Sequence, residues 1–115
     1  MKKIELTFGD RTFTAKFGVV FLGKYLKSTS QSIQEMLTEF QSNPFYEGPN
    51  LMYASFKHFD PTLELSFDEL ADLLDENGGV QSPQLIAFIQ AFTDSITVDI
   101  PAETLGKSKK PKLKN

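Results

Sequence analysis

The sequence predicts an α+β fold in which a small N-terminal β-hairpin packs on a bundle of four to five α-helices. Apolar and polar residues alternate over residues 3–17, and this spacing is typical of two strands that each bury one face. After Gly18 the apolar residues recur every three or four positions as far as residue 96, which is typical of amphipathic helices. With 115 residues, the chain has the length of one domain with a real hydrophobic core.

The hairpin is predicted from two short apolar stripes and the turn between them. The stripes consist of alternate residues: Ile4, Leu6 and Phe8, then Phe13, Ala15 and Phe17. Between the stripes lie Gly9 and Asp10, which are residue types that tight turns favour. Because an isolated hairpin is marginally stable in water, we expect its apolar face to pack against the helices that follow.

The first helix is expected from about Val19 to Lys27. Its apolar residues form two adjacent stripes: Val19, Leu22 and Leu26, then Phe21 and Tyr25. Two stripes side by side make a helix apolar over most of its circumference. We therefore expect this helix to lie at the centre of the core.

Two further helices are predicted before residue 60. Ser32 and Glu35 have the spacing of a capping box, in which each side chain bonds the other residue's backbone N–H, so a helix should follow Ser32. Asn43-Pro44 should end that helix, and Gly48-Pro49 should begin the next one, which ends before Asp60-Pro61. The residues expected to be buried are Ile33, Met36, Leu37 and Phe40, then Met52, Phe56 and Phe59.

The last two helices also carry start and stop signals. Ser66 and Glu69 form a second predicted capping box, and Asn77-Gly78-Gly79 is a helix stop of the kind that glycine permits. Ser82-Pro83 should begin the final helix, and residues 97–101 are expected to be extended. The residues expected to point inward are Phe67, Leu70, Leu73 and Leu74, then Leu85, Ile86, Phe88, Ile89, Phe92 and Ile96. The predicted core of the whole chain includes Phe13, Phe17, Leu22, Leu26, Leu37, Phe40, Leu70, Leu74, Phe88 and Phe92.

Charge distinguishes a globular domain, residues 1–105, from a basic tail, residues 106–115, which we expect to be disordered. Five of the twelve Lys and Arg residues lie in the tail, so the domain has seven bases against all fifteen acids and a net charge of about −8. Lysine runs can bind nucleic acid, but this tail has no aromatic residue for base stacking, and the acidic domain would repel phosphates. We therefore expect a solvated tail and no nucleic-acid partner.

No set of residues predicts catalysis, a cofactor or a metal site. The chain lacks cysteine, which excludes thiolate chemistry, and its one histidine, His58, has no nucleophile beside it in the sequence. Five acids lie close together in the fourth predicted helix: Asp68, Glu69, Asp72, Asp75 and Glu76. Cation-binding acids are typical of loops with alternating ligands, so we interpret these five as a solvated helix face. We expect a protein that is not an enzyme.

The sequence also carries no sign of a membrane protein. No apolar run reaches the roughly 20 residues of a membrane span, and the first residues lack the apolar centre of a signal peptide. We therefore expect a cytoplasmic protein with no membrane partner.

Aromatic residues give the best indication of a partner surface. The chain has eleven Phe and three Tyr residues, most of which must be core. Five of them lie in the segment from Pro44 to Phe59, which glycine and proline interrupt, and such a segment can present apolar surface to a partner. The predicted partner-binding residues are Phe45, Tyr46, Tyr53 and Phe56. Burial in the core is the alternative for these four side chains.

The order of these features resembles the tail assembly chaperones of long-tailed phages and prophages of Gram-positive bacteria. The resemblance covers about residues 3–96. It rests on the segment Arg11-Thr-Phe-Thr-Ala-Lys-Phe17, on the apolar helix after Gly18, and on the acidic, leucine-rich helix from Ser66 to Glu76. The family has no invariant catalytic motif.

This resemblance implies a small, non-enzymatic protein of the host cytoplasm that is absent from the mature virion. It implies that the chain self-associates and binds the hydrophobic tape measure protein during tail assembly, with the tail tube protein as a further partner. Family members are often made in two lengths by translational frameshifting, and Lys109-Lys110 is compatible with a slippery site. Two alternatives of other classes remain: a structural head–tail or tail component of the virion, and a small nucleic-acid-binding regulator.

Overall fold

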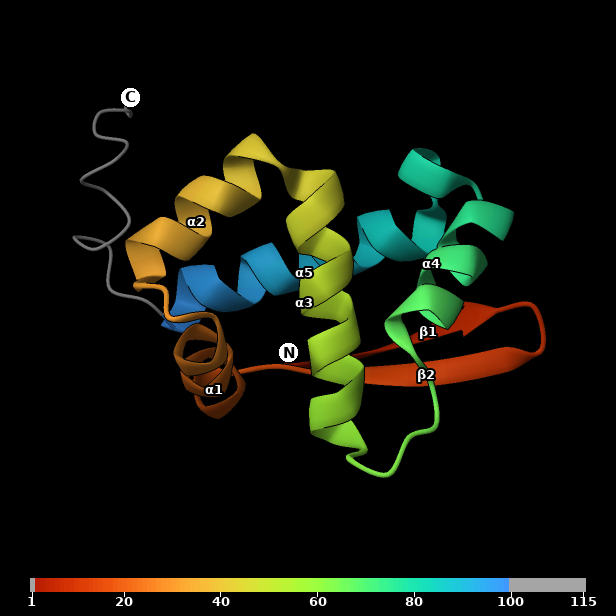
Figure 1. Cartoon of the computed structure of the whole chain (residues 1–115), viewed down its shortest axis with the longest axis horizontal. Coiled ribbons are helices and arrows are strands. Elements are labelled where there is room, and N and C mark those ends of the chain that lie inside the picture. The colour runs from red at the N-terminus through yellow and green to blue at the C-terminus, as the bar shows by residue number, and fades with distance from the viewer. Residues whose placement is uncertain (1, 100–115) are drawn as a thin grey trace.

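Two strands and five α-helices follow one another through residues 2–99, the part of the chain that this computed structural model describes (Figure 1). In order they are β1 (Lys3–Phe8), β2 (Arg11–Lys16), α1 (Val19–Thr29), α2 (Ile33–Ser42), α3 (Pro44–Phe59), α4 (Phe67–Glu76), the short 3₁₀ helix η1 (Gly79–Gln81) and α5 (Pro83–Asp99). This order confirms the predicted α+β class, with an N-terminal hairpin and a mainly helical body. The predicted domain limit at residue 105 and the basic tail, residues 106–115, lie outside the described residues.

The hairpin forms because its two apolar stripes fall on one face of an antiparallel pair. Leu6 of β1 lies opposite Phe13 of β2, and both side chains are buried. Gly9 has a φ of 64°, a left-handed backbone that glycine adopts without strain, and it forms the two-residue turn with Asp10. β2 packs on α3 and β1 packs on α5. The helices therefore cover the apolar face of the hairpin, as the sequence predicts.

α3 is the central element of the fold. It contacts β2, α1, α2, α4 and α5, and Figure 1 shows it crossing the middle of the molecule. Leu51, Met52 and Phe56 of α3 are almost completely buried, and the Phe56 ring stacks on Phe13 of β2 with centroids 5.2 Å apart. Burial of each such side chain stabilises the fold by about 1.5–3 kcal/mol. This helix therefore anchors the hairpin.

The expectation that the first helix lies at the centre of the core is wrong. Phe21, Leu22 and Tyr25 of α1 are buried, but Val19 and Val20 are 70% and 61% exposed. α1 lies toward one end of the molecule and packs mainly on α3 (Figure 1). No element within residues 2–99 therefore covers the valines of its first turn, and they remain exposed.

α3 begins at Pro44 and not at Gly48, so the segment predicted as a connection is the first part of a helix. Pro44 occupies the first helical turn, where its missing N–H breaks no hydrogen bond. Pro49 lies inside the helix and removes the hydrogen bond that the carbonyl of Phe45 would accept. Packing offsets this cost, because Gly48 lies so close to α5 that an added Cβ would be 3.4 Å from Cδ1 of Ile89.

The predicted capping residues at the starts of α2, α4 and α5 are confirmed. Ser32 with Glu35 at α2, and Ser66 with Glu69 at α4, form capping boxes whose hydrogen bonds are 2.8 and 3.0 Å long. The Oγ of Ser82 accepts the backbone N–H three residues later at 3.2 Å and caps α5. Each such cap typically contributes about 1 kcal/mol to stability.

The core lies mostly where the sequence places it. Seven of the ten predicted core residues are buried: Phe13, Phe17, Leu22, Leu70, Leu74, Phe88 and Phe92. The other three pack against this core and are partly buried: Leu26, Leu37 and Phe40. Three side chains expected to point inward are exposed: Phe59, Phe67 and Ile86. α5 continues to Asp99, whereas the sequence favours an extended segment from residue 97.

Phe88 of α5 gives a direct test of this core. Its ring is fully buried, with the ring of Phe17 edge-on at 6.0 Å and that of Phe92 stacked at 6.0 Å. Phe88→Ala should lower the free energy of unfolding by about 3–5 kcal/mol, because it removes a buried ring and leaves a cavity. Ile86→Ala, on the exposed side of the same helix, should change it by less than about 0.5 kcal/mol. Chemical denaturation measures both changes, and equal losses would contradict the assigned buried face of α5.

Candidate functional site

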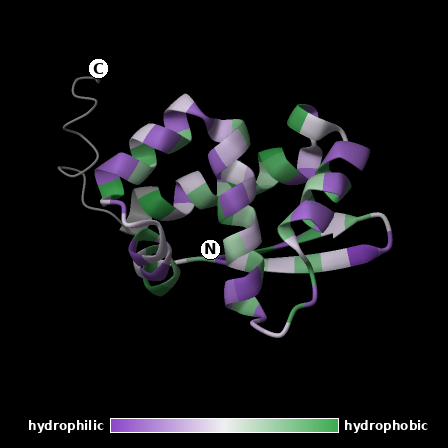
Figure 2. Ribbon diagram, in the orientation of Figure 1, coloured by the Kyte–Doolittle hydropathy of each residue, from purple (hydrophilic) through white to green (hydrophobic). Residues whose placement is uncertain are grey.

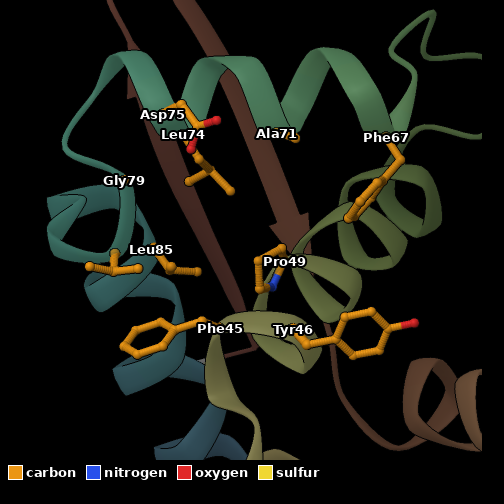
Figure 3. A pocket seen from close by; sticks show the side chains of 10 residues that line it. Phe45, Tyr46, Pro49, Phe67, Ala71, Leu74, Asp75, Gly79 and Leu85 are labelled. Carbon is orange, nitrogen blue, oxygen red and sulfur yellow. The ribbon is translucent and has the colours of Figure 1, made fainter.

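An apolar groove of about 260 Å³ opens between α3, α4, η1 and the start of α5 (Figure 3). Its main lining residues are Phe45, Tyr46 and Pro49 of α3, Phe67, Ala71 and Leu74 of α4, and Val80 of η1. Figure 3 shows the α4 residues facing the first turns of α3, with the rings of Phe45 and Tyr46 extending to opposite sides of Pro49. The groove is therefore bounded mainly by two facing helices.

Large apolar side chains are exposed along this groove. Phe45 is 57%, Tyr46 67%, Val80 59% and Phe67 37% exposed. Eight large apolar residues are exposed among residues 2–96, whose burial the structure describes, and half of them line this one groove. Exposed apolar side chains that gather in one place, unlike scattered ones, are typical of interaction sites.

The starts of two helices place the aromatic rings at the groove. Pro44 begins α3, and Phe45 and Pro49 lie four residues apart on one face of that helix. α4 begins after its capping box, and Phe67 and Ala71 have the same spacing on the facing helix. A side chain in a helix leans over the turn that precedes it, and a first-turn residue has no preceding turn. The rings of Phe45 and Phe67 therefore extend beyond the N-terminal ends of their helices.

One acid of α4 lines the groove. Asp75 lines it, and the other four acids of α4 are also exposed: Asp68, Glu69, Asp72 and Glu76. Of the described residues, no Lys or Arg lines the groove. Within residues 2–99 no group of three His, Asp or Glu side chains is placed to hold a metal ion. The groove thus combines an apolar lining with one carboxylate, Asp75, which suits an apolar segment that carries positive charge.

The structure separates the four predicted partner-binding residues. Phe45 and Tyr46 lie at the groove and are exposed, as the prediction requires. Tyr53 is partly buried: its hydroxyl donates to the carbonyl of Leu65 at 2.8 Å, and its ring meets that of Phe67 edge-on at 5.8 Å. Phe56 is a core residue with 1% exposure, so its assignment to the partner surface is wrong. Phe56 is buried because it lies on the face of α3 that packs on β2.

A second pocket, polar and about 340 Å³ in volume, shares Tyr46 with the groove. Its walls include Tyr25 of α1 and Glu47 of α3, which are 8% and 4% exposed. The hydroxyl of Tyr25 donates to Oε2 of Glu47 at 2.7 Å. Burial, together with the hydrogen bond to Glu47, raises the pKa of Tyr25 far above its ordinary value, so the phenol stays protonated at neutral pH. No local pattern predicts this pair, because its residues are 22 positions apart.

His58 has a structural environment. It is partly buried on α3, and its ring packs on that of Phe21 with centroids 5.6 Å apart. Burial lowers its pKa, and the nearby positive charges of Lys24 and Lys16 lower it further. The imidazole is therefore neutral at physiological pH and serves as part of the contact between α1 and α3.

No protein-family model, curated protein or solved structure matches this chain. None of the helices in the described part of the chain has the length and hydropathy needed to cross a bilayer. What the chain binds is therefore inferred from the geometry of the groove and from the sequence pattern.

The buried tyrosine should make stability depend on pH at the alkaline end. Because folding raises the pKa of Tyr25, its contribution is present in full below about pH 10, where unfolded tyrosine ionises, and is lost as the pH rises further. Tyr25→Phe should cost about 1–3 kcal/mol at neutral pH, since it removes the donor to a buried carboxylate, and it should flatten the alkaline loss.

Urea denaturation from neutral to strongly alkaline pH measures both effects. Tyr46→Phe is the control, because its side chain is mostly exposed, and it should preserve both the stability and its alkaline decline. An alkaline decline that is as steep in Tyr25→Phe as in the wild type would contradict the buried pair.

Proposed function

We propose that this chain is a non-enzymatic tail assembly chaperone of a long-tailed phage or prophage, and that it binds the hydrophobic tape measure protein during tail assembly. The observation that carries the proposal is the exposed apolar groove between α3 and α4. The resemblance of residues 3–96 to that chaperone family suggests the partner. The groove offers a surface on which an apolar segment of that partner can lie.

A helix is the conformation of the partner that suits this groove best. In helix-in-groove recognition, an amphipathic helix places apolar residues from successive turns into a hydrophobic channel. Here the channel runs between two helices, and each helix lines it with side chains four residues apart, such as Phe45 and Pro49 of α3. The side chains of a third helix can pack between these side chains. Phe45 and Tyr46 are the large, rigid side chains that interfaces favour as anchors.

The outer faces of α2 and α4 give the complex a charged exterior. Figure 2 shows hydrophilic and hydrophobic residues alternating along both helices. The exposed hydrophilic ones include Glu35 of α2 and Asp68 and Asp72 of α4. Negative charge on each copy repels other loaded copies, so many copies could cover a long apolar protein without aggregation. We infer that the chain acts in the host cytoplasm and leaves before the virion is complete.

The double substitution Phe45→Ser and Tyr46→Ser tests the groove as the binding surface. Both side chains are exposed, so the fold should remain intact, while capture of a soluble tape measure fragment should be lost. A pull-down assay measures capture, and circular dichroism confirms folding.

Val19→Ser with Val20→Ser is the matched control. These residues are a comparably exposed apolar pair in the first turn of α1, and neither lines the groove. The control variant should capture the fragment as well as the wild type does. Undiminished capture by the Phe45 and Tyr46 variant would exclude the groove and direct attention to the open edges of the hairpin.

A further inference from the structure

Glu47 is a buried acid that has no basic partner in the described part of the chain. Only 4% of its surface is exposed, and among residues 2–99 its side chain accepts one hydrogen bond, from the neutral hydroxyl of Tyr25. No Lys or Arg of the described residues lines the polar pocket around it. A buried carboxylate is costly unless a cation and further hydrogen bonds compensate its lost hydration. Among residues 2–99, no basic side chain therefore compensates the carboxylate of Glu47.

Two other polar groups of this pocket use a hydrogen-bond donor within the protein. Nδ2 of Asn50 donates to the carbonyl of Tyr46 at 2.9 Å, and Oγ1 of Thr29 donates to Oε1 of Gln31 at 2.9 Å. Glu39 of α2 adds a second carboxylate to the lining. Two carboxylates, with no Lys or Arg of the described residues beside them, give this pocket an excess of acceptor oxygens, and that chemistry binds an ammonium or guanidinium group.

Tyr46 connects this polar pocket to the apolar groove. This residue lines both spaces and is 67% exposed, and its ring points away from Phe45 in Figure 3. Lysine and arginine lay their methylene stems along apolar or aromatic surface while the charged head reaches a polar site. A basic side chain on a segment in the groove can therefore pass over Tyr46 and place its charge beside Glu47.

We propose that the polar pocket binds a lysine or arginine side chain carried by the apolar helix that occupies the groove. The inference rests on the proposed function, since it requires a helical partner in the groove. The proposal limits the partner segments that the groove recognises to helices whose apolar stripe has one basic residue beside it. Such a residue fixes the register of the bound helix, and an apolar stretch that lacks it leaves Glu47 unpaired and binds more weakly.

Synthetic helices test the inference on the full chain. The reference peptide, of about 20 residues, has Leu and Ala on one face and Gln on the other. In a matched set of further peptides, each peptide has a single Gln replaced by Lys. The replaced position differs from one peptide to the next, so that the set covers one helical turn. In calorimetric titrations of the wild type, at least one Lys peptide should bind about tenfold more tightly than the reference peptide. Glu47→Gln, which keeps an acceptor for Tyr25 and removes the charge, should abolish this preference and leave binding of the reference peptide unchanged.

Asp72→Asn is the matched control for charge, because Asp72 is an exposed acid that lines neither pocket, and it should retain the preference. Glu39→Gln is the second variant at the pocket and should weaken the preference even where Glu47→Gln fails to fold. Equal binding of the Lys and reference peptides by the wild type, or a preference that survives Glu47→Gln, would overturn the inference and leave the function of the groove standing. Failure of every peptide to bind would overturn both.

Discussion

The packing of α3 on the hairpin is the constraint on which the rest of the structure depends. A two-stranded sheet is not stable by itself, and the stacked rings of Phe13 and Phe56, 5.2 Å apart, join its apolar face to the C-terminal part of α3. α4 and α5 pack on the same helix, so its 16 residues organise most of the core. Its first turns extend to the groove, where Phe45 and Tyr46 remain exposed. One helix therefore both completes the core and carries the main wall of the candidate site.

Local signals were enough to predict most element boundaries. The capping boxes at Ser32 and Ser66 use residues three positions apart, so their hydrogen bonds form within one helical turn and the spacing alone identifies them. The start of α3 depends instead on tertiary packing, because the helix continues through Gly48 and Pro49, where Gly48 lies against α5. The exposure of Val19 has a similar origin. Periodicity identifies the faces of a helix, but only the packed structure determines which face another element covers.

The candidate site was predictable only in part, because local patterns do not show which helix faces are covered by other elements. Phe45 and Tyr46 stand out as aromatic residues next to helix-breaking residue types, and both are exposed at the groove. Phe56 belongs to the same segment, but it lies two to three turns further along α3, on the face that meets β2. Phe67 has the spacing of a buried residue, yet its place in the first turn of α4 leaves it open at the groove. The contact of Glu47 with a tyrosine of another helix has no local signature at all.

The central claim is that the groove between α3 and α4 binds an apolar helical segment, and a chemical-shift map measures this most directly. A ¹⁵N-labelled sample of the chain would be titrated with a soluble tape measure fragment while its backbone amide resonances are followed. The account predicts the largest shifts at residues 45–50, 67–75 and 79–81, which border the groove, and small shifts in the hairpin and in the first turn of α1. Shifts concentrated on the hairpin edge, with the groove residues unaffected, would contradict it.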